Sequence, residues 1–211
     1  WPVEVSVAAS SLTDDSENKG IYTDGIPAGY AVENIDGVWT VNKYDVVSDG
    51  LLKKDAKYLV TNANGLATLN DMMVDKSAGR KISVSLNADI DFTGKTWTPV
   101  DSHVDFGFVI AELNGNGHTI SNLTINGQAM FTRFAGQGVE IKDITFDNAT
   151  VNSNGSINTA IIVGHTYQNV LLDNVDVMNS TIIGGYKVAP LIGTVYNEDP
   201  SKTITATLKN C

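Results

Sequence analysis

The sequence contains one cysteine, Cys211, and two arginines, Arg80 and Arg133. A single cysteine excludes an internal disulfide and a cysteine-based zinc site. No stretch approaches the roughly 18 consecutive apolar residues of a transmembrane helix, so membrane insertion is not expected. Charged residues make up only 18% of the 211 residues and the formal net charge is −10. That balance argues against nucleic acid as a partner, because a phosphate backbone requires a basic surface.

The C-terminal half of the chain repeats itself. One recurring unit consists of short alternating apolar runs, at 114–125, 139–146, 170–177 and 204–211. A second unit lies between these runs, at 129–132, 160–164 and 189–193. Units of this size bury their apolar faces only by stacking on neighbouring units. The repeat therefore predicts an all-β fold, specifically a right-handed parallel β-solenoid (β-helix).

Spacing within the repeat gives a register. Gly164 and Gly193 are 29 residues apart, and Ile144 and Val175 are 31 apart. Leu123 and Ile144 are only 21 apart, which predicts that the first coil lacks an excursion present in later coils.

Three regions are expected along the chain. Residues 1–45 are predicted to form a small β appendage or the end of an upstream module. Alternation predicts a strand at 1–8, and a hairpin is predicted from 30–34 and 38–41, which flank Asp-Gly at 36–37. Residues 46–105 are predicted to contain a capping helix and the first strands. Residues 106–211 are predicted to form the solenoid repeats, truncated at the C-terminus.

The helix is predicted within residues 46–80. Leu66, Leu69, Met72 and Met73 follow helical spacing. Asn62 or Asn64 is the expected N-cap. A helix directly before a solenoid is expected to cover the open apolar end of the first coil.

The stretches 88–100 and 113–125, followed by units of the type Ala-x-Leu/Ile-Ile/Val-Gly, resemble the GLUG-repeat proteins of bacterial cell surfaces. The resemblance implies an extracellular or cell-surface, adhesin-like protein. Its role would be a structural or recognition segment, with a glycan or a host surface protein as the candidate ligand, joined to further repeats of the same polypeptide. Two alternatives stay open. One is a carbohydrate-active enzyme of the β-helix type, and the other is a passive stalk without a ligand.

Several polar residues are candidates for catalytic or metal sites. Alternation would place Asp101, His103 and Asp105 on one face of a strand, within reach of a metal ion, but a polar loop is the favoured interpretation. His118 is interpreted as a turn histidine that satisfies backbone groups. Asp89 and Asp91 alternate like a glycosidase or lyase pair and are interpreted as turn-capping residues, because neither arginine falls beside acids in the repeat. No catalytic residue, metal or cofactor is predicted, and the protein is not expected to be an enzyme.

The candidate ligand-binding residues are Tyr167, Tyr196 and His165. Each tyrosine follows its repeat glycine by three residues, so the two rings are expected to stack on adjacent coils about 4.8 Å apart. Val163 and Ile192 are expected on the same side of the strand, which would give a partly apolar stripe. The stripe could bind sugar rings, although coverage by the excursions of the later coils, at 149–156 and 180–185, is the favoured interpretation. His165 is expected to face outward without a carboxylate neighbour.

Overall fold

The computed structural model describes residues 6–7, 27–35 and 38–211. The first three strands, β1 (Ser6–Val7), β2 (Tyr30–Ile35) and β3 (Val38–Lys43), form an antiparallel sheet in the order β1-β3-β2. The pairing of β2 with β3 confirms the predicted hairpin, whose turn residues lie outside the described residues. Of the strand predicted at 1–8, the described part is β1.

Three strands that the sequence pattern did not predict come next. They are β4 (Asp45–Ser48), β5 (Leu51–Lys54) and β6 (Lys57–Val60), joined in an antiparallel meander. Helix α1 (Ala63–Val74) follows, and its N-cap Asn62 accepts a hydrogen bond from the Gly65 amide, as one of the two predicted caps should. The predicted stripe packs inward, with Leu66, Leu69 and Met73 buried.

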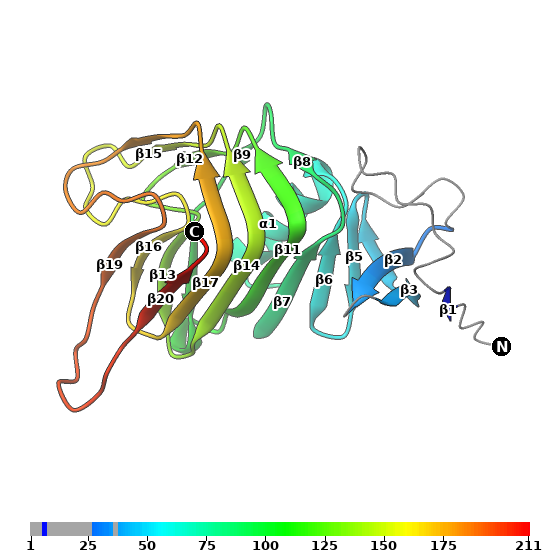
Figure 1. Ribbon diagram of the computed structural model, residues 1–211, viewed down its shortest axis with the longest axis horizontal. Coiled ribbons are helices and arrows are strands. Elements are labelled where there is room, and N and C mark those ends of the chain that lie inside the picture. Colours follow the sequence, from blue (N-terminus) through cyan, green and yellow to red (C-terminus); the bar gives the residue numbers. More distant parts are fainter. Residues whose placement is uncertain (1–5, 8–26, 36–37) are drawn as a thin grey trace.

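The rest of the chain forms an all-β arrangement dominated by parallel sheets (Figure 1). The nine-stranded sheet runs in the order β20-β17-β14-β11-β7-β6-β5-β4, with β8 paired to β11. Two four-stranded sheets have the orders β18-β15-β12-β9 and β10-β13-β16-β19. From β9 to β20 the chain visits these three sheets in turn. The strand bounds are β7 Lys81–Leu86, β8 Ile90–Asp91, β9 Thr96–Trp97, β10 Val100–His103, β11 Val109–Ser121, β12 Thr124–Asn126, β13 Phe131–Ala135, β14 Val139–Asp147, β15 Thr150–Asn152, β16 Val163–Thr166, β17 Val170–Met178, β18 Thr181–Ile183, β19 Ile192–Val195 and β20 Ala206–Lys209.

One apolar core is shared by the three sheets and α1. Helix α1 contacts β5, β6, β9 and β10, which are early strands of all three sheets. Asn70 of the helix fixes this position, because its side chain accepts from the Thr98 amide and donates to the Thr98 carbonyl, at 2.8 and 2.9 Å.

The strand register corrects one part of the predicted repeat. Ile144 pairs with His118 on one side and Val175 on the other, whereas Leu123 lies outside the strands. The predicted equivalence of Leu123 and Ile144 is therefore wrong. The second unit is aligned as predicted, since Phe131, Val163 and Ile192 are in register.

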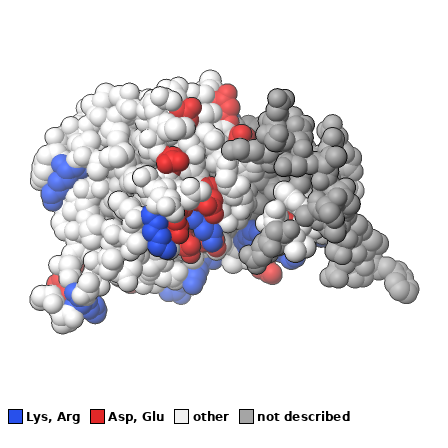
Figure 2. Space-filling view, viewed as in Figure 1, with Lys and Arg blue, Asp and Glu red and all other residues white. Residues whose placement is uncertain are grey.

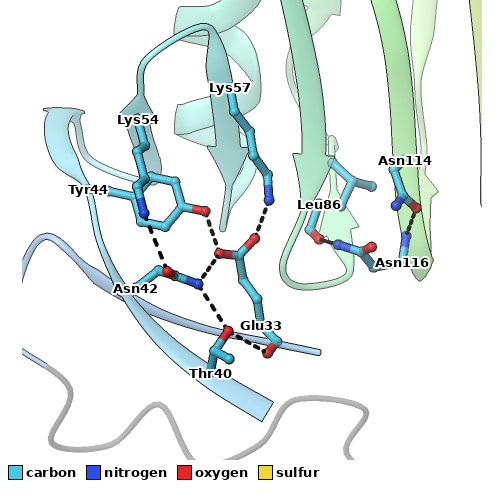
Figure 3. A network of polar contacts seen from close by, with 9 residues as sticks. All are labelled: Glu33, Thr40, Asn42, Tyr44, Lys54, Lys57, Leu86, Asn114 and Asn116. Atoms are coloured by element: carbon cyan, nitrogen blue, oxygen red, sulfur yellow. Dashed lines mark hydrogen bonds and ion pairs between the residues drawn. The ribbon is translucent and has the colours of Figure 1, made fainter. Parts of the chain in front are cut away.

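The Asn-Gly-Asn-Gly-His block forms an irregularity within β11. The pairing with β14 shifts between Asn114 and His118, and Asn116 adopts a positive φ of 51°. Asn116 donates to the Leu86 carbonyl at 2.7 Å, and its amide donates to the Asn114 side chain at 2.9 Å (Figure 3). A Cβ on Gly115 would lie 2.3 Å from the Asp143 carbonyl oxygen, so glycine is required there by close backbone approach.

A buried carboxylate connects the small N-terminal sheet to the nine-stranded sheet. Glu33 of β2 is 5% exposed and accepts hydrogen bonds from the Tyr44 hydroxyl, the Lys57 ammonium and the Asn42 amide (Figure 3). Lys57 belongs to β6, so the ion pair crosses between the two sheets. An apolar cluster accompanies this junction, in which Leu52 and Leu59 pack with Ala31 and Tyr44.

The Tyr44 hydroxyl makes this junction sensitive to alkali. Burial, together with the hydrogen bond to Glu33 and its charge, raises the pKa of Tyr44 above its ordinary value of 10.0. A group whose folded pKa is raised stabilises the fold below its unfolded pKa and loses that contribution as the pH rises further. Unfolding experiments should therefore show stability falling above about pH 10. In Tyr44→Phe the decline should be shallower, and equal slopes in the two proteins would contradict the assignment.

Candidate functional site

The outer face of the β10-β13-β16-β19 sheet carries a column of polar side chains. Asp101, Arg133, His165 and Thr194 are in register on its four strands. A bulge just before these residues shifts the pairing. On β16, Val163 is fully buried in the core, whereas His165, two residues later, is half-buried on the outside. The predicted sharing of one face by Val163 and the tyrosines is therefore wrong.

Arg133 lies directly beside an acid, contrary to the sequence interpretation. Its Nε and Nη2 donate to the two carboxylate oxygens of Asp101 at 3.0 and 2.7 Å. This bidentate contact is the main reason that the pKa of Arg133 is raised. Asp101 therefore has both of its oxygens occupied.

The candidate metal set of Asp101, His103 and Asp105, for which a polar loop was the favoured interpretation, is not held on one strand face. Asp101 and His103 lie on β10, but Asp105 lies in a 3₁₀ turn, η2 (Val104–Phe106), where its amide donates to His103 Nδ1 at 3.1 Å. Within the described ranges, no group of three or more His, Cys, Asp or Glu side chains is placed to hold a metal ion.

His165 lies between the two candidate tyrosines. Its ring centroid is 5.4 Å from that of Tyr167 and 5.8 Å from that of Tyr196, both in edge-on geometry. Its Nδ1 is buried and has no hydrogen-bond partner among the described residues. Burial, and then the charge of Arg133, lowers the pKa of His165, while Asp101 acts in the opposite direction. Asp101 is two strands away from His165 in this sheet, with Arg133 between them in register, so its charge acts on the imidazole at longer range.

Tyr167 and Tyr196 stack on each other as the repeat predicted. Their ring centroids are 5.3 Å apart with an interplanar angle of 18°. Both are half-buried, so the excursions do not enclose them in a second core. Lys187, from the β18–β19 connection, lies 4.9 Å from the Tyr196 ring centroid and donates to its hydroxyl at 3.1 Å.

A groove of about 480 Å³ opens beside Tyr167. Its lining is predominantly polar and comes from two chain segments, one at each of two neighbouring β-connections. The lining residues are Tyr167, Gln168, Asn169, Asn197, Glu198, Asp199, Lys202, Thr203 and Ile204.

The groove exists because one connection is longer than its counterpart. Thr166 is in register with Val195, and Val170 with Ala206. Between β16 and β17 the chain crosses this interval with three residues, 167–169, whereas between β19 and β20 it uses ten, 196–205. We call these ten residues the inserted loop. It projects between β19 and β20 at the lower left of Figure 1, and Figure 2 shows charged side chains of both signs on it.

The inserted loop is held in shape by its own hydrogen bonds. Asp199 Oδ1 accepts from the amide and hydroxyl of Ser201 at 3.0 and 2.6 Å, and Asp199 forms an ion pair with Lys202 at 3.2 Å. The contacts with Ser201 are the main cause of the lowered pKa of Asp199. Asn197 donates to the Lys202 carbonyl at 2.7 Å, and Asn169 accepts from the Thr205 amide at 2.9 Å. The side of the groove formed by the inserted loop is therefore already ordered before a ligand binds.

The remaining sequence candidates lie away from the groove, around β8 and β11. His118 Nδ1 is 3.2 Å from an Asp89 oxygen, which also accepts from the Thr119 amide at 2.9 Å. His118 is thus a buried strand residue that contacts a carboxylate, and its interpretation as a turn histidine is corrected. Asp91 caps a turn as predicted, because it accepts from the amide and hydroxyl of Thr93.

Together, the fold and the groove define an all-β protein of stacked parallel strands with a preformed polar groove on one edge. No family model matches the chain, and no solved structure matches it. The chain is similar to Halomucin of Haloquadratum walsbyi, with 30% identity over 107 residues. The similarity covers 48% of this chain, which spans 1% of the length of that protein. None of the helices in the described residues is both long and apolar enough to cross a membrane.

Proposed function

We propose that this chain is a non-catalytic recognition segment of a secreted or surface-displayed protein, and that the groove beside Tyr167 binds a glycan. The observation that carries the proposal is the inserted loop. The repeat closes the same interval with three residues, so the longer loop is not needed for stacking. Insertions within repeats often form the binding face of such proteins.

For the architecture, we propose a right-handed β-solenoid of the GLUG-repeat type. The regular visits of the chain to three parallel sheets support it, and parallel crossover connections are right-handed in about 98% of cases. In this arrangement α1 would cap the first coil, since it contacts β5, β6, β9 and β10. The short span of Halomucin covered by this chain is compatible with further repeats in the same polypeptide.

The composition of the groove favours a glycan over a protein partner. Ligand sites for sugars need donors and acceptors that match hydroxyl groups, together with an aromatic side chain. Gln168 and Asn169 offer amides, Glu198 offers an acceptor, and Tyr167 offers the aromatic side chain. An extended apolar surface, which a protein interface would need at its centre, is not part of this lining.

We favour recognition over catalysis because Glu198 is the one acid of the groove without a hydrogen-bond partner among the described residues, whereas a glycosidase uses a pair of carboxylates. Asp101 is held by Arg133, and Asp199 by Ser201 and Lys202. The β-helix enzyme alternative would require a basic residue free to act beside an acid. Arg133 is beside one, but two of its nitrogen atoms are engaged with Asp101.

Truncation of Tyr167 tests the glycan proposal. In a glycan array followed by titration of the bound sugars, Tyr167→Ala should weaken binding roughly two- to tenfold, because an aromatic contact contributes about 0.5–1.5 kcal/mol. The matched control is Tyr30→Ala, which removes a tyrosine that is 38% exposed on the small N-terminal sheet. The control should bind as wild type does.

Thermal unfolding must accompany the titration, since Tyr167 also stacks on Tyr196. Binding that is equal in wild type and in a folded Tyr167→Ala protein would remove the groove as the site. A wild-type protein that binds no glycan on the array would favour the passive stalk.

A further inference from the structure

The cationic side chains around the groove are all engaged with other groups. Arg133 is paired with Asp101, and Lys202 is paired with Asp199. Lys187 donates to the Tyr196 hydroxyl and lies over that ring. An acidic ligand would therefore have to break an existing contact to gain a counter-ion.

The groups that remain for a ligand are amides, a hydroxyl and one carboxylate. The side chains of Gln168, Glu198 and Thr203 have no hydrogen-bond partner within the described part of the chain, although the Glu198 charge acts on Arg133 at longer range. An amide and a hydroxyl can donate to or accept from a sugar hydroxyl, whereas a carboxylate only accepts. Each of the three can bind an uncharged polyol.

The local charge has the same sign as that of the whole chain. Two acids, Glu198 and Asp199, face one base, Lys202, so the lining carries −1, within a chain of net charge −10. A carboxylate or sulfate on the ligand would be repelled by the negative charge of the lining and by that of the whole chain.

From these observations we propose that the groove selects uncharged glycans over acidic ones, and that Glu198 is the residue that excludes acidic sugars. This inference rests on the glycan-binding function proposed above. Glu198 would accept a hydrogen bond from a hydroxyl of the neutral sugar, and the same carboxylate would face the carboxylate of a uronate. Selection would therefore come from repulsion of the wrong ligand as well as from attraction of the right one.

Matched sugars separate charge from shape. The probes are linear pentasaccharides of glucose, mannose and galactose, each compared with its counterpart oxidised at C6 to the uronate. Calorimetric titration should show at least one neutral probe binding ten times or more tightly than its uronate. Glu198→Gln should reduce that preference by about three- to tenfold, the effect of one charge a few ångströms away in a partly solvated groove. Raising the salt concentration should also reduce the wild-type preference.

Asp176→Asn is the matched control. Asp176 is exposed on β17, outside the groove, so this variant removes one charge from the chain and should keep the wild-type preference. A uronate that binds as tightly as its neutral counterpart, with binding lost in Tyr167→Ala, would overturn the selectivity and leave the proposed function standing. Failure of all six probes to bind would overturn the selectivity as well, and the array would then decide the function.

Discussion

Ile144→Asp should prevent the protein from folding. Ile144 is 2% exposed and lies in the middle of the nine-stranded sheet, in register with His118 and Val175. The substitution loses about 1.5–3 kcal/mol of apolar burial and places a carboxylate in the core without a partner. The total is comparable to the roughly 5–15 kcal/mol that holds a typical domain together. Circular dichroism should show loss of the β signal, and the soluble yield should collapse.

Thr150→Asp provides the matched control for this prediction. Thr150 is exposed on β15, in register with Thr124 and Thr181, so the new carboxylate would meet solvent and two hydroxyl groups. Its melting temperature should stay within a few degrees of wild type, since a surface change of this kind costs about 0.5 kcal/mol or less. An Ile144→Asp protein that melts with the control would show that β14 is assigned in the wrong register.

The stacking of units was predictable from the sequence because equivalent residues recur at constant spacing. The spacing of Gly164 and Gly193 correctly aligned β16 with β19, and with them Tyr167 with Tyr196. The sequence pattern misaligned β11 with β14 for a physical reason. The inward position of β11 opposite Ile144 holds His118, a polar residue, and the apolar pattern led instead to Leu123.

The side of the sheet on which a residue lies was harder to predict. Strict alternation places Val163 and His165 on one face, but Val163 is fully buried and His165 is half-buried. A bulge in the pairing of β10 with β13 precedes the polar column. Bulges of this type shift every following side chain and leave little trace in the sequence. The same irregularity set Arg133 beside Asp101, a contact that the sequence interpretation missed.

The groove could have been anticipated from loop length alone. Alternation cannot identify Gln168, Asn169 and the inserted loop as one site, because they come from two separate connections, β16–β17 and β19–β20. The interval between Gly193 and the next apolar run is longer than the interval after Gly164, and this extra length is the signal. Which polar side chains line the groove depends on the turn at Asp199, and that required the structure.

Glu33→Ala should release the small N-terminal sheet while the remaining sheets stay folded. The variant leaves the Tyr44 hydroxyl and Lys57 without their shared acceptor. Breaking a buried ion pair costs about 3–5 kcal/mol, but Lys57 is 36% exposed and water can solvate it. We therefore expect a loss of about 2–3 kcal/mol, which corresponds to a roughly thirty- to 150-fold increase in amide exchange in β2 and β3. Exchange in β14 and β17 should be unchanged.

The matched control for this prediction is Glu112→Ala, which removes an acid from another ion pair with a lysine. Glu112 pairs with Lys142 at 2.7 Å, and the two side chains are 34% and 29% exposed. Pairs this close to solvent contribute about 1 kcal/mol or less, so Glu112→Ala should have a small effect on exchange. The two variants differ mainly in burial of the carboxylate and in the contacts from Tyr44 and Asn42. If exchange in β2 and β3 were equal in both, the small sheet would be held by the apolar contacts of Ala31 and Leu52, and the buried carboxylate would have no special role at the junction.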